Sequence, residues 1–306
     1  MRNALLWAST DEWVANRLPR YRFVRRAVRR FMPGELLEDA LAEAEALRSS
    51  GAATIVTKLG ENVTAPEDAD EVASEYELAY TEIASRGLDS QISVKLTQLG
   101  LDLDRGLALR HCEHLAAVAA RSGKLLWVDM ESSAYTQTTV DVYRTLKERH
   151  SNVGLALQSY LHRTKDDLES LLELSPAIRF VKGAYAEPAD VAFPNKRDVD
   201  EAYFAHAERL LGVIAAGGGG FAAFGTHDPV LMRRLDARVR ELEIPPERYE
   251  FEMLYGIGLG EQNRLLAANT PLRVLISYGD AWFPWYMRRL AERPANVWFV
   301  ARSMFR

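Results

Sequence analysis

Eight short apolar segments, each followed by a longer amphipathic stretch, are the feature that most restricts how this chain folds. The segments are apolar at consecutive positions rather than at alternate ones, which is typical of parallel strands covered by helices. They occupy residues 52–59, 91–97, 124–130, 152–160, 178–185, 220–227, 248–256 and 272–279. The stretches between them, such as 66–87, 107–123 and 199–218, have helical periodicity, and several end on glycine. The sequence therefore predicts eight strand–helix units.

Eight units of this length match a (β/α)8 TIM barrel, which typically takes about 250 residues. A doubly wound open sheet is the alternative, but it usually has fewer strands and a glycine-rich phosphate-binding turn after the first one. The turn here, KLGEN at residues 58–62, lacks that signature. We therefore predict an α/β fold with a barrel over residues 51–306. Residues 1–50, rich in helix formers, are expected to form an N-terminal helical segment packed on the barrel.

Charge and composition argue against several classes of protein. The formal net charge of −5 disfavours a general nucleic-acid-binding surface, and the basic run at residues 20–31 is the local exception. We interpret this run as the solvated face of a helix, with a docking patch for a partner or membrane as the alternative. A single cysteine, Cys112, fits a reducing compartment, and no apolar stretch approaches membrane-spanning length. The expected location is the cytoplasm, with peripheral contact to the inner face of the membrane left open.

Polar side chains mark the carboxyl ends of the predicted strands, the end at which barrel enzymes place their sites. Arg179 and Lys182 raise a particular question, because desolvating a cation in a buried strand is costly unless an anion answers it. The other polar groups at these ends are Glu61, Lys95, Asp129, Glu131, Gln158, Thr226 and His227. Because these ends meet on one face of a barrel, we expect a single site there.

Several of these residues also have simple structural explanations. Arg288 and Glu292 are spaced as in a surface helix pair worth about 0.3 to 0.5 kcal/mol, and His227 precedes a residue suited to capping a helix. His111 and His114 lie three residues apart on a predicted helix. Two histidines without a third placed ligand are weak grounds for a metal site. We therefore expect no metal.

Taken together, the motifs resemble the bacterial monofunctional proline dehydrogenases. The resemblance is carried, in order, by SVKLTQLGL, VDMES, LQSYLHRT, RFVKGAYAEP, THDP, FEMLYG and YGDAWFPWYMRRLAERPAN, and it covers about residues 50–306. It implies a distorted (β/α)8 barrel that holds FAD noncovalently, with the final helix above the substrate. A cation beside a flavin would stabilise the negative charge that arrives with a hydride, which suggests a purpose for Arg179.

The resemblance also implies roles for individual residues. Contact with FAD is implied for Met130, Gln158, Arg179, Lys182, Gly183, Ala184, Thr226 and His227. The substrate carboxylate is expected to be clamped by Lys95, Arg288 and Arg289, with Glu292 orienting the two arginines. Asp129 is expected near the substrate amine. Asp129 and Arg179 are thus the candidate catalytic residues.

The implied reaction is oxidation of L-proline to Δ1-pyrroline-5-carboxylate by hydride transfer to FAD. Electrons then pass to a quinone, and a functional link to a pyrroline-5-carboxylate dehydrogenase is expected. One residue departs from the family: Leu275 stands where a tyrosine packs against the substrate ring, and Tyr278 occurs nearby. This leaves open a related cyclic substrate such as hydroxyproline or pipecolate.

Two other classes of function remain as alternatives. A Schiff-base barrel enzyme, an aldolase or pyridoxal-phosphate protein, would use Lys182 as its nucleophile. A noncatalytic relative that binds an amino acid or a flavin would be compatible with Leu275.

Overall fold

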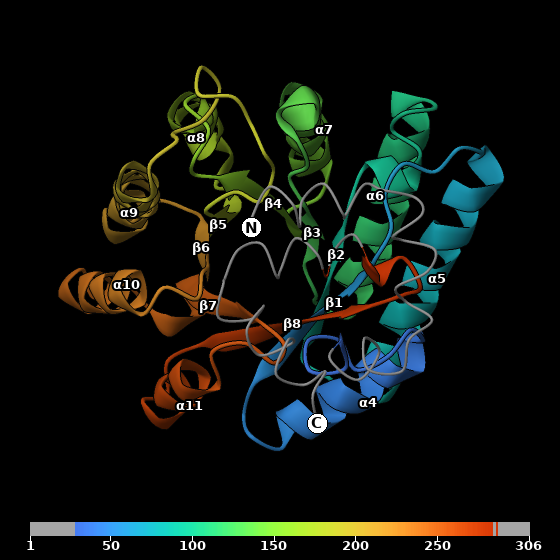
Figure 1. Cartoon of the computed structure of the whole chain (residues 1–306), viewed down its shortest axis with the longest axis horizontal. Coiled ribbons are helices and arrows are strands. Elements are labelled where there is room, and N and C mark those ends of the chain that lie inside the picture. The colour runs from blue at the N-terminus through green and yellow to red at the C-terminus, as the bar shows by residue number, and fades with distance from the viewer. Residues whose placement is uncertain (1–27, 284–285, 287–306) are drawn as a thin grey trace, which may run out of the picture.

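A computed structural model describes residues 28–283 and 286 of the chain. Eight parallel strands form a closed barrel in which each strand pairs with the next and β8 pairs with β1 (Figure 1). The strands are β1 (Ala53–Lys58), β2 (Ser90–Val94), β3 (Leu126–Val128), β4 (Val153–Gln158), β5 (Ala177–Val181), β6 (Phe221–Gly225), β7 (Tyr249–Leu254) and β8 (Leu272–Tyr278). The predicted barrel is confirmed. Each strand ends before the predicted residue, so most of the polar groups at the strand ends lie on the rim.

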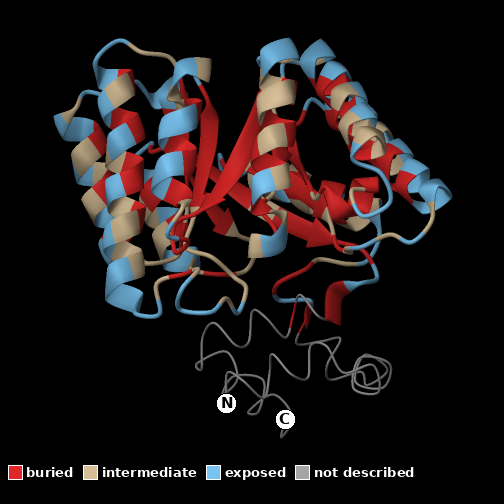
Figure 2. Cartoon of the chain, turned by 90° about the horizontal axis from the view of Figure 1, so that it is seen from above, coloured by how far each residue is buried: buried red, intermediate tan, exposed pale blue. Residues whose placement is uncertain are grey.

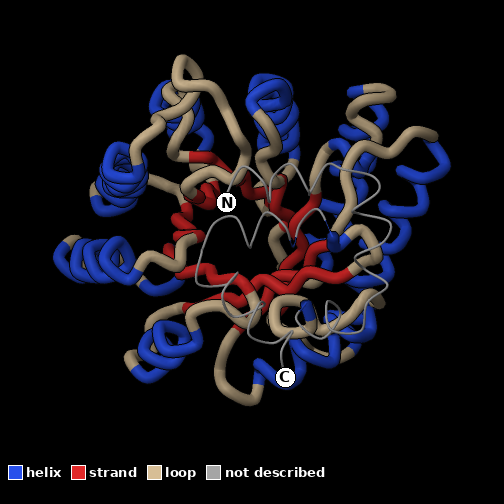
Figure 3. Tube along the Cα trace, viewed as in Figure 1, coloured by secondary structure: helices blue, strands red, loops and turns tan. Residues whose placement is uncertain are grey.

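Helices surround the barrel and cover the outer faces of its strands (Figure 3). They are α4 (Leu37–Arg48), α5 (Pro66–Ser85), α6 (Arg105–Arg121), α7 (Ser133–Arg149), α8 (Thr164–Leu171), α9 (Lys196–Ala215), α10 (Pro229–Glu241) and α11 (Leu259–Ala267). Local sequence explains several helix starts. Asp104 and Asp228 accept backbone hydrogen bonds at the starts of α6 and α10, and Pro66 begins α5.

Helix α4 lies in the described part, residues 28–50, of the predicted N-terminal helical segment. Its sequence is rich in Ala, Leu and Glu, which favour helix. Its buried residues Ala40, Leu41 and Ala44 join the same core cluster as strand residues of the barrel. Helix α4 takes a place in the ring beside α5, against β1 and β8 (Figure 1). A helix packed on the barrel is therefore present before β1. Of the basic run at residues 20–31, residues 20–27 lie outside the described residues.

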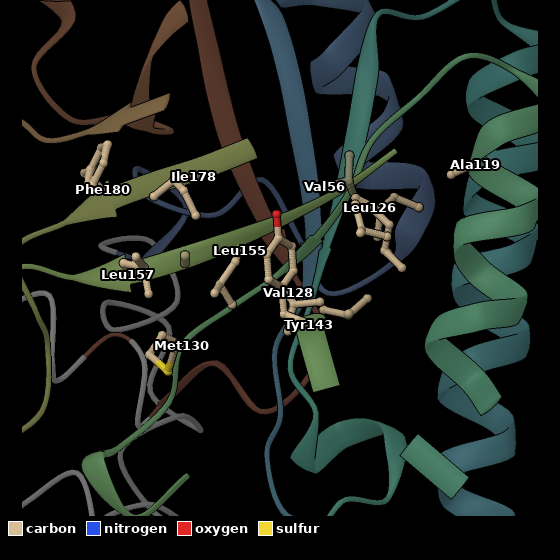
Figure 4. Packing of buried hydrophobic residues seen from close by; sticks show 14 of the residues in the cluster. Val56, Ala119, Leu126, Val128, Met130, Tyr143, Leu155, Leu157, Ile178 and Phe180 are labelled. Atoms are coloured by element: carbon tan, nitrogen blue, oxygen red, sulfur yellow. The ribbon is translucent and has the colours of Figure 1, made fainter. Parts of the chain in front are cut away.

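Side chains along the strands alternate between the helix-covered outside of the barrel and its interior. Outward residues such as Val128 and Leu155 pack in one large apolar cluster (Figure 4), and most strand residues are buried (Figure 2). The interior is more polar, because Ser93, Arg179 and Glu252 meet there through a hydrogen bond and an ion pair. Among the described residues, no helix is long and apolar enough to cross a membrane.

Candidate active site

Arg179 on β5 is the centre of the interior polar cluster. Its Nη1 donates to Asp129 Oδ1 at 2.8 Å and to Ser93 Oγ at 2.9 Å, and Ser93 Oγ also donates to Asp129 Oδ1 at 2.8 Å. The guanidinium carbon lies 4.4 Å from the ring centroid of Trp127, a distance suited to a cation–π contact. Arg179 and Asp129, the two candidate catalytic residues, are therefore in direct contact.

A second carboxylate, Glu252 on β7, contacts Arg179 from another direction. Its Oε2 lies 2.5 Å from Arg179 Nε, and both side chains are 3% exposed. Burial raises the pKa of Glu252 to about 8, against the opposing charge of Arg179. Arg179 is thus held between two of the protein's own carboxyl groups, those of Asp129 and Glu252.

The sequence prediction missed Glu252, although the sequence contains a signal for it. Glu250 and Glu252 alternate with Phe251 and Met253 in β7, so the two carboxyl groups share a face of the strand. That face is the interior, where Glu250 accepts two hydrogen bonds from Arg273 Nε at 3.1 and 3.0 Å. Charges alternating with apolar residues in a buried strand predict interior ion pairs.

Gln158, the last residue of β4, lies one strand away from Arg179. Its Nε2 donates to the backbone oxygens of Met130 at 3.2 Å and Glu131 at 2.6 Å. Its Oε1 is buried and has no hydrogen-bond partner among the described residues, and the same holds for Arg179 Nη2. An unpaired acceptor and an unpaired donor on adjacent strands could serve the edge of a heteroaromatic ring that carries both kinds of group.

Lys182 follows β5 but turns away from this cluster. Its ammonium forms ion pairs with Asp200 of α9 and, at 3.0 Å, with Asp228 at the start of α10. Lys196 bonds the same two carboxylates. Strand alternation could have predicted this, because Ile178, Phe180 and Lys182 share the outer face. Contact of Lys182 with FAD stays a prediction.

This lysine–aspartate network predicts a pH-dependent contribution to stability. Burial would raise the pKa of Asp228, but hydrogen bonds and charge from Lys196 and Lys182 outweigh it and hold this pKa well below its usual range. The resulting stability is present above the ordinary aspartate pKa and is lost as the pH falls toward the folded value. Asp228→Asn keeps a residue that can cap the helix. It should lower the free energy of unfolding by about 1 kcal/mol near neutral pH, and by less in acid.

Urea unfolding across the acid range measures this difference. Glu201→Gln is the matched control, because Glu201 forms an exposed ion pair with Arg234 and its loss should change little. A cost for Asp228→Asn that is the same in acid as at neutral pH would contradict the assignment.

Gly183 and Ala184, predicted to lie against a flat cofactor ring, follow the end of β5. In the structure an aromatic ring already lies beside Gly183: a Cβ built on this residue would fall 2.3 Å from Tyr160 Cδ1. The backbone of Gly183 has φ of +121°, a value that other residues rarely adopt. Glycine is therefore required here by the local structure, and the predicted contacts of Gly183 and Ala184 with FAD remain untested.

Replacing Gly183 tests this requirement. Gly183→Ala should lower the free energy of unfolding by about 1 to 3 kcal/mol, because the backbone is strained and the Tyr160 ring must move. Gly212→Ala is the control, since Gly212 lies within α9 with no atom within 4 Å of a built Cβ, and alanine favours helix there by up to about 1 kcal/mol. Equal effects of the two substitutions in urea unfolding would show that Gly183 is not constrained.

Three more predicted cofactor residues lie near the strand ends. Met130 follows β3 and is buried in the apolar cluster (Figure 4). Thr226 follows β6 and is buried, with its Oγ1 accepting the backbone N–H of Asp228 at 3.2 Å. His227 Nε2 accepts the backbone N–H of Leu254 at 2.8 Å, so the hydrogen of the neutral ring is on Nδ1.

Of the residues predicted to bind the substrate, Lys95 and Leu275 lie within the described part of the chain. Lys95 follows β2, is half-buried and takes part in no ion pair with another described residue. Leu275 lies in β8, in register with Ile55 of β1 and Leu254 of β7, and is the half-buried residue of an otherwise buried strand. Tyr278 is fully buried on the opposite, helix-covered face, so it does not replace the missing tyrosine.

The remaining predicted residues, Arg288, Arg289 and Glu292, lie outside the described residues. His111 and His114 are part of a helix–helix contact: His111 bonds Asp70 and His114 bonds Glu77, both of α5, at 2.9 and 2.8 Å. Across residues 28–283 and 286, no group of three or more His, Cys, Asp or Glu side chains is arranged to hold a metal ion.

Fold and site define a (β/α)8-barrel protein with a buried arginine–carboxylate cluster toward the carboxyl ends of its strands. This chain belongs to the proline dehydrogenase family, whose family model matches residues 40–302. It is 37% identical over 282 residues to proline dehydrogenase 1 of Bacillus subtilis subsp. natto, covering 92% of each chain. It is 35% identical over 286 residues to the proline dehydrogenase of Deinococcus radiodurans, covering 90% of this chain and 89% of that one.

Solved structures of proline utilization A share the fold. The protein from Bdellovibrio bacteriovorus superposes with a TM-score of 0.81 at 22% identity, over 95% of this chain and 36% of that one. The protein from Bradyrhizobium japonicum gives a TM-score of 0.72 at 23% identity, over 92% and 32%. The chain thus spans about a third of the length of these proteins.

Proposed function

We propose that this protein oxidises L-proline to Δ1-pyrroline-5-carboxylate, with FAD as its bound cofactor and a quinone as the electron acceptor. The observation that carries the proposal is the family match over residues 40–302, a range that includes the site residues described above. The physical support is the arrangement of charge around Arg179, which suits a reaction that delivers negative charge to one place.

The fit of the site to FAD rests on two unpaired atoms. Arg179 Nη2 is a buried donor and Gln158 Oε1 a buried acceptor without hydrogen bonds to described residues. The edge of an isoalloxazine ring carries both acceptors and an N–H group, so it could satisfy both atoms. When bound, FAD supplies an acceptor for the hydride that leaves the substrate.

The chain's own residues orient the substrate and place charge. The Arg179 guanidinium is held by Asp129 and Glu252, so it is oriented before the reaction starts. Both side-chain hydrogen bonds of Asp129 end on Oδ1, and its side chain is 23% exposed, so the carboxylate is accessible to a substrate amine. Lys95 is available for the substrate carboxylate, together with Arg288 and Arg289 by family resemblance.

The Schiff-base alternative receives less support from the site. Its nucleophile would be a lysine amine free to attack a carbonyl, whereas Lys182 is engaged by Asp200 and Asp228 and faces away from the interior cluster. The proposed oxidation instead uses the interior cluster of Arg179, Asp129 and Glu252. The imine product would then be consumed by a pyrroline-5-carboxylate dehydrogenase activity. We expect the reaction in the cytoplasm, with electrons passing to a quinone at a membrane.

Steady-state turnover tests the proposal. Purified protein reconstituted with FAD should reduce a soluble quinone analogue only when L-proline is present, and a cyclic imine should accumulate in equal amount. D-proline and L-alanine are the control substrates, and neither should support quinone reduction if the pocket is specific for L-proline. Two results would contradict the proposed reaction: quinone reduction without formation of an imine, or no quinone reduction with any cyclic amino acid.

A further inference from the structure

Glu252 lies beneath the candidate site, and the proposed roles of the other residues leave it unexplained. Its Oε2 contacts Arg179 Nε at 2.5 Å, while its Oε1 is buried and has no hydrogen-bond partner among the described residues. An apolar or amide side chain would fill this position without the cost of burying an ionisable group. The carboxyl group at this point therefore suggests a use for its charge.

Strand β6 is built so that Arg179 and Glu252 can meet. The two residues belong to β5 and β7, which β6 separates by roughly 10 Å. In register with them on β6 are Ala223 and Gly225. A Cβ built on Gly225 would fall 2.9 Å from Val181 Cγ1 and 3.7 Å from Arg179 Cγ. The small residues of β6 leave space for two long side chains to cross it.

Charged groups of both signs surround Glu252. Arg179 of β5 and Arg273 of β8 favour its ionised form, whereas the nearby charge of Glu250 of β7 disfavours it. Burial has the largest effect, and the pKa of Glu252 is raised to about 8. Tyr203 of α9 also interacts with Glu252, and burial keeps the pKa of Tyr203 well above the usual range. The titration of Glu252 is therefore shifted from the acid range toward neutral pH.

We infer that Glu252 is a positioning residue that holds the Arg179 guanidinium and, by gaining or losing a proton, sets the positive charge that Arg179 offers to a bound flavin. With Glu252 ionised, Arg179 is shared between two carboxylates, Asp129 and Glu252. With Glu252 protonated, Arg179 balances Asp129 alone, and more of its charge acts on the site above. The inference rests on the flavin site of the proposed function, but not on the oxidation of proline.

The reduction potential of the bound flavin, measured electrochemically without proline, tests the inference. Glu252→Gln keeps the shape of the side chain and removes its charge. Because an ionised Glu252 disfavours added electrons, the wild-type potential should fall below that of the variant above about pH 8 and converge with it in more acidic solution. A difference that is constant with pH would indicate packing alone, and no difference would remove Glu252 from the site; either result overturns the inference.

Glu250→Gln is the matched second variant. It removes the neighbouring negative charge that raises the pKa of Glu252, so it should keep the pH-dependent fall in potential but move it to lower pH. A fall in potential at the wild-type pH in this variant would assign the titration to another group.

Urea unfolding of the flavin-free proteins gives a test that needs no cofactor. The folded state raises the pKa of Glu252 from 4.5 to about 8, so this group's stabilising contribution is complete below the unfolded value and is lost as the pH rises through the folded one. Wild type should therefore lose stability relative to Glu252→Gln over this range, and a constant difference overturns the inference. Wild-type protein that binds no flavin would instead contradict the proposed function.

Discussion

Arg179→Met should reduce flavin by L-proline about 100- to 1000-fold more slowly than wild type, because the site loses a preorganised positive charge. The same substitution should lower the free energy of unfolding by about 3 kcal/mol. It leaves the Asp129 and Glu252 carboxyl groups without their shared cation, and removing one partner of a buried pair costs about 3 to 5 kcal/mol. We expect the smaller loss of this range, because Glu252 can take up a proton and so avoid leaving an unpaired buried charge. Stopped-flow absorbance and urea unfolding measure the two effects.

Arg209→Met is the control for this substitution. Arg209 pairs with Glu169 on the surface, where both side chains are more than 40% exposed, so its loss should leave both rate and stability nearly unchanged. Flavin reduction at wild-type speed in Arg179→Met, with full flavin occupancy, would exclude Arg179 from the reaction.

Leu275→Tyr should shift substrate preference toward proline. Leu275 is the half-buried residue of β8, and a leucine offers a smaller, wholly apolar wall than the tyrosine of the family. Wild type should therefore tolerate hydroxyproline or pipecolate. Apolar pockets discriminate such changes by about 1 to 3 kcal/mol. The ratio of kcat/KM for proline over these analogues should then rise by about 10- to 200-fold in the variant.

Leu275→Phe separates the two properties that tyrosine adds. A ring without a hydroxyl should reproduce most of the shift if steric bulk decides preference, and little of it if the hydroxyl does. If wild type already prefers proline as strongly as Leu275→Tyr does, the leucine at this position has no effect on substrate preference.

The barrel could be predicted from sequence because its signal is local. Eight apolar runs separated by helical periodicity leave few arrangements of the chain. Charged residues at inward positions of these runs, such as Arg179, Glu252 and Arg273, mark the polar interior. The outward turn of Lys182 was predictable by the same means, since Ile178 and Phe180 precede it on one face of β5. Reading Arg179 and Lys182 as one pair of cations overlooked this alternation.

The contact of Arg179 with Glu252 could not be predicted in the same way. The two residues lie 73 positions apart, and they meet only because the sheet closes into a barrel and β6 presents Ala223 and Gly225 between them. Barrel closure also determines that Leu275 faces inward while Tyr278 packs under the helices. Such pairings depend on strand register, which periodicity alone does not specify.

Anaerobic titration of the purified, FAD-loaded protein with L-proline, followed by its visible spectrum, tests the central claim most directly. The account predicts that the flavin absorption bands bleach in proportion to added L-proline and that a quinone restores them. D-proline and a matched sample of Arg179→Met serve as controls. Flavin bands that L-proline leaves unchanged, while dithionite bleaches them fully, would contradict the account.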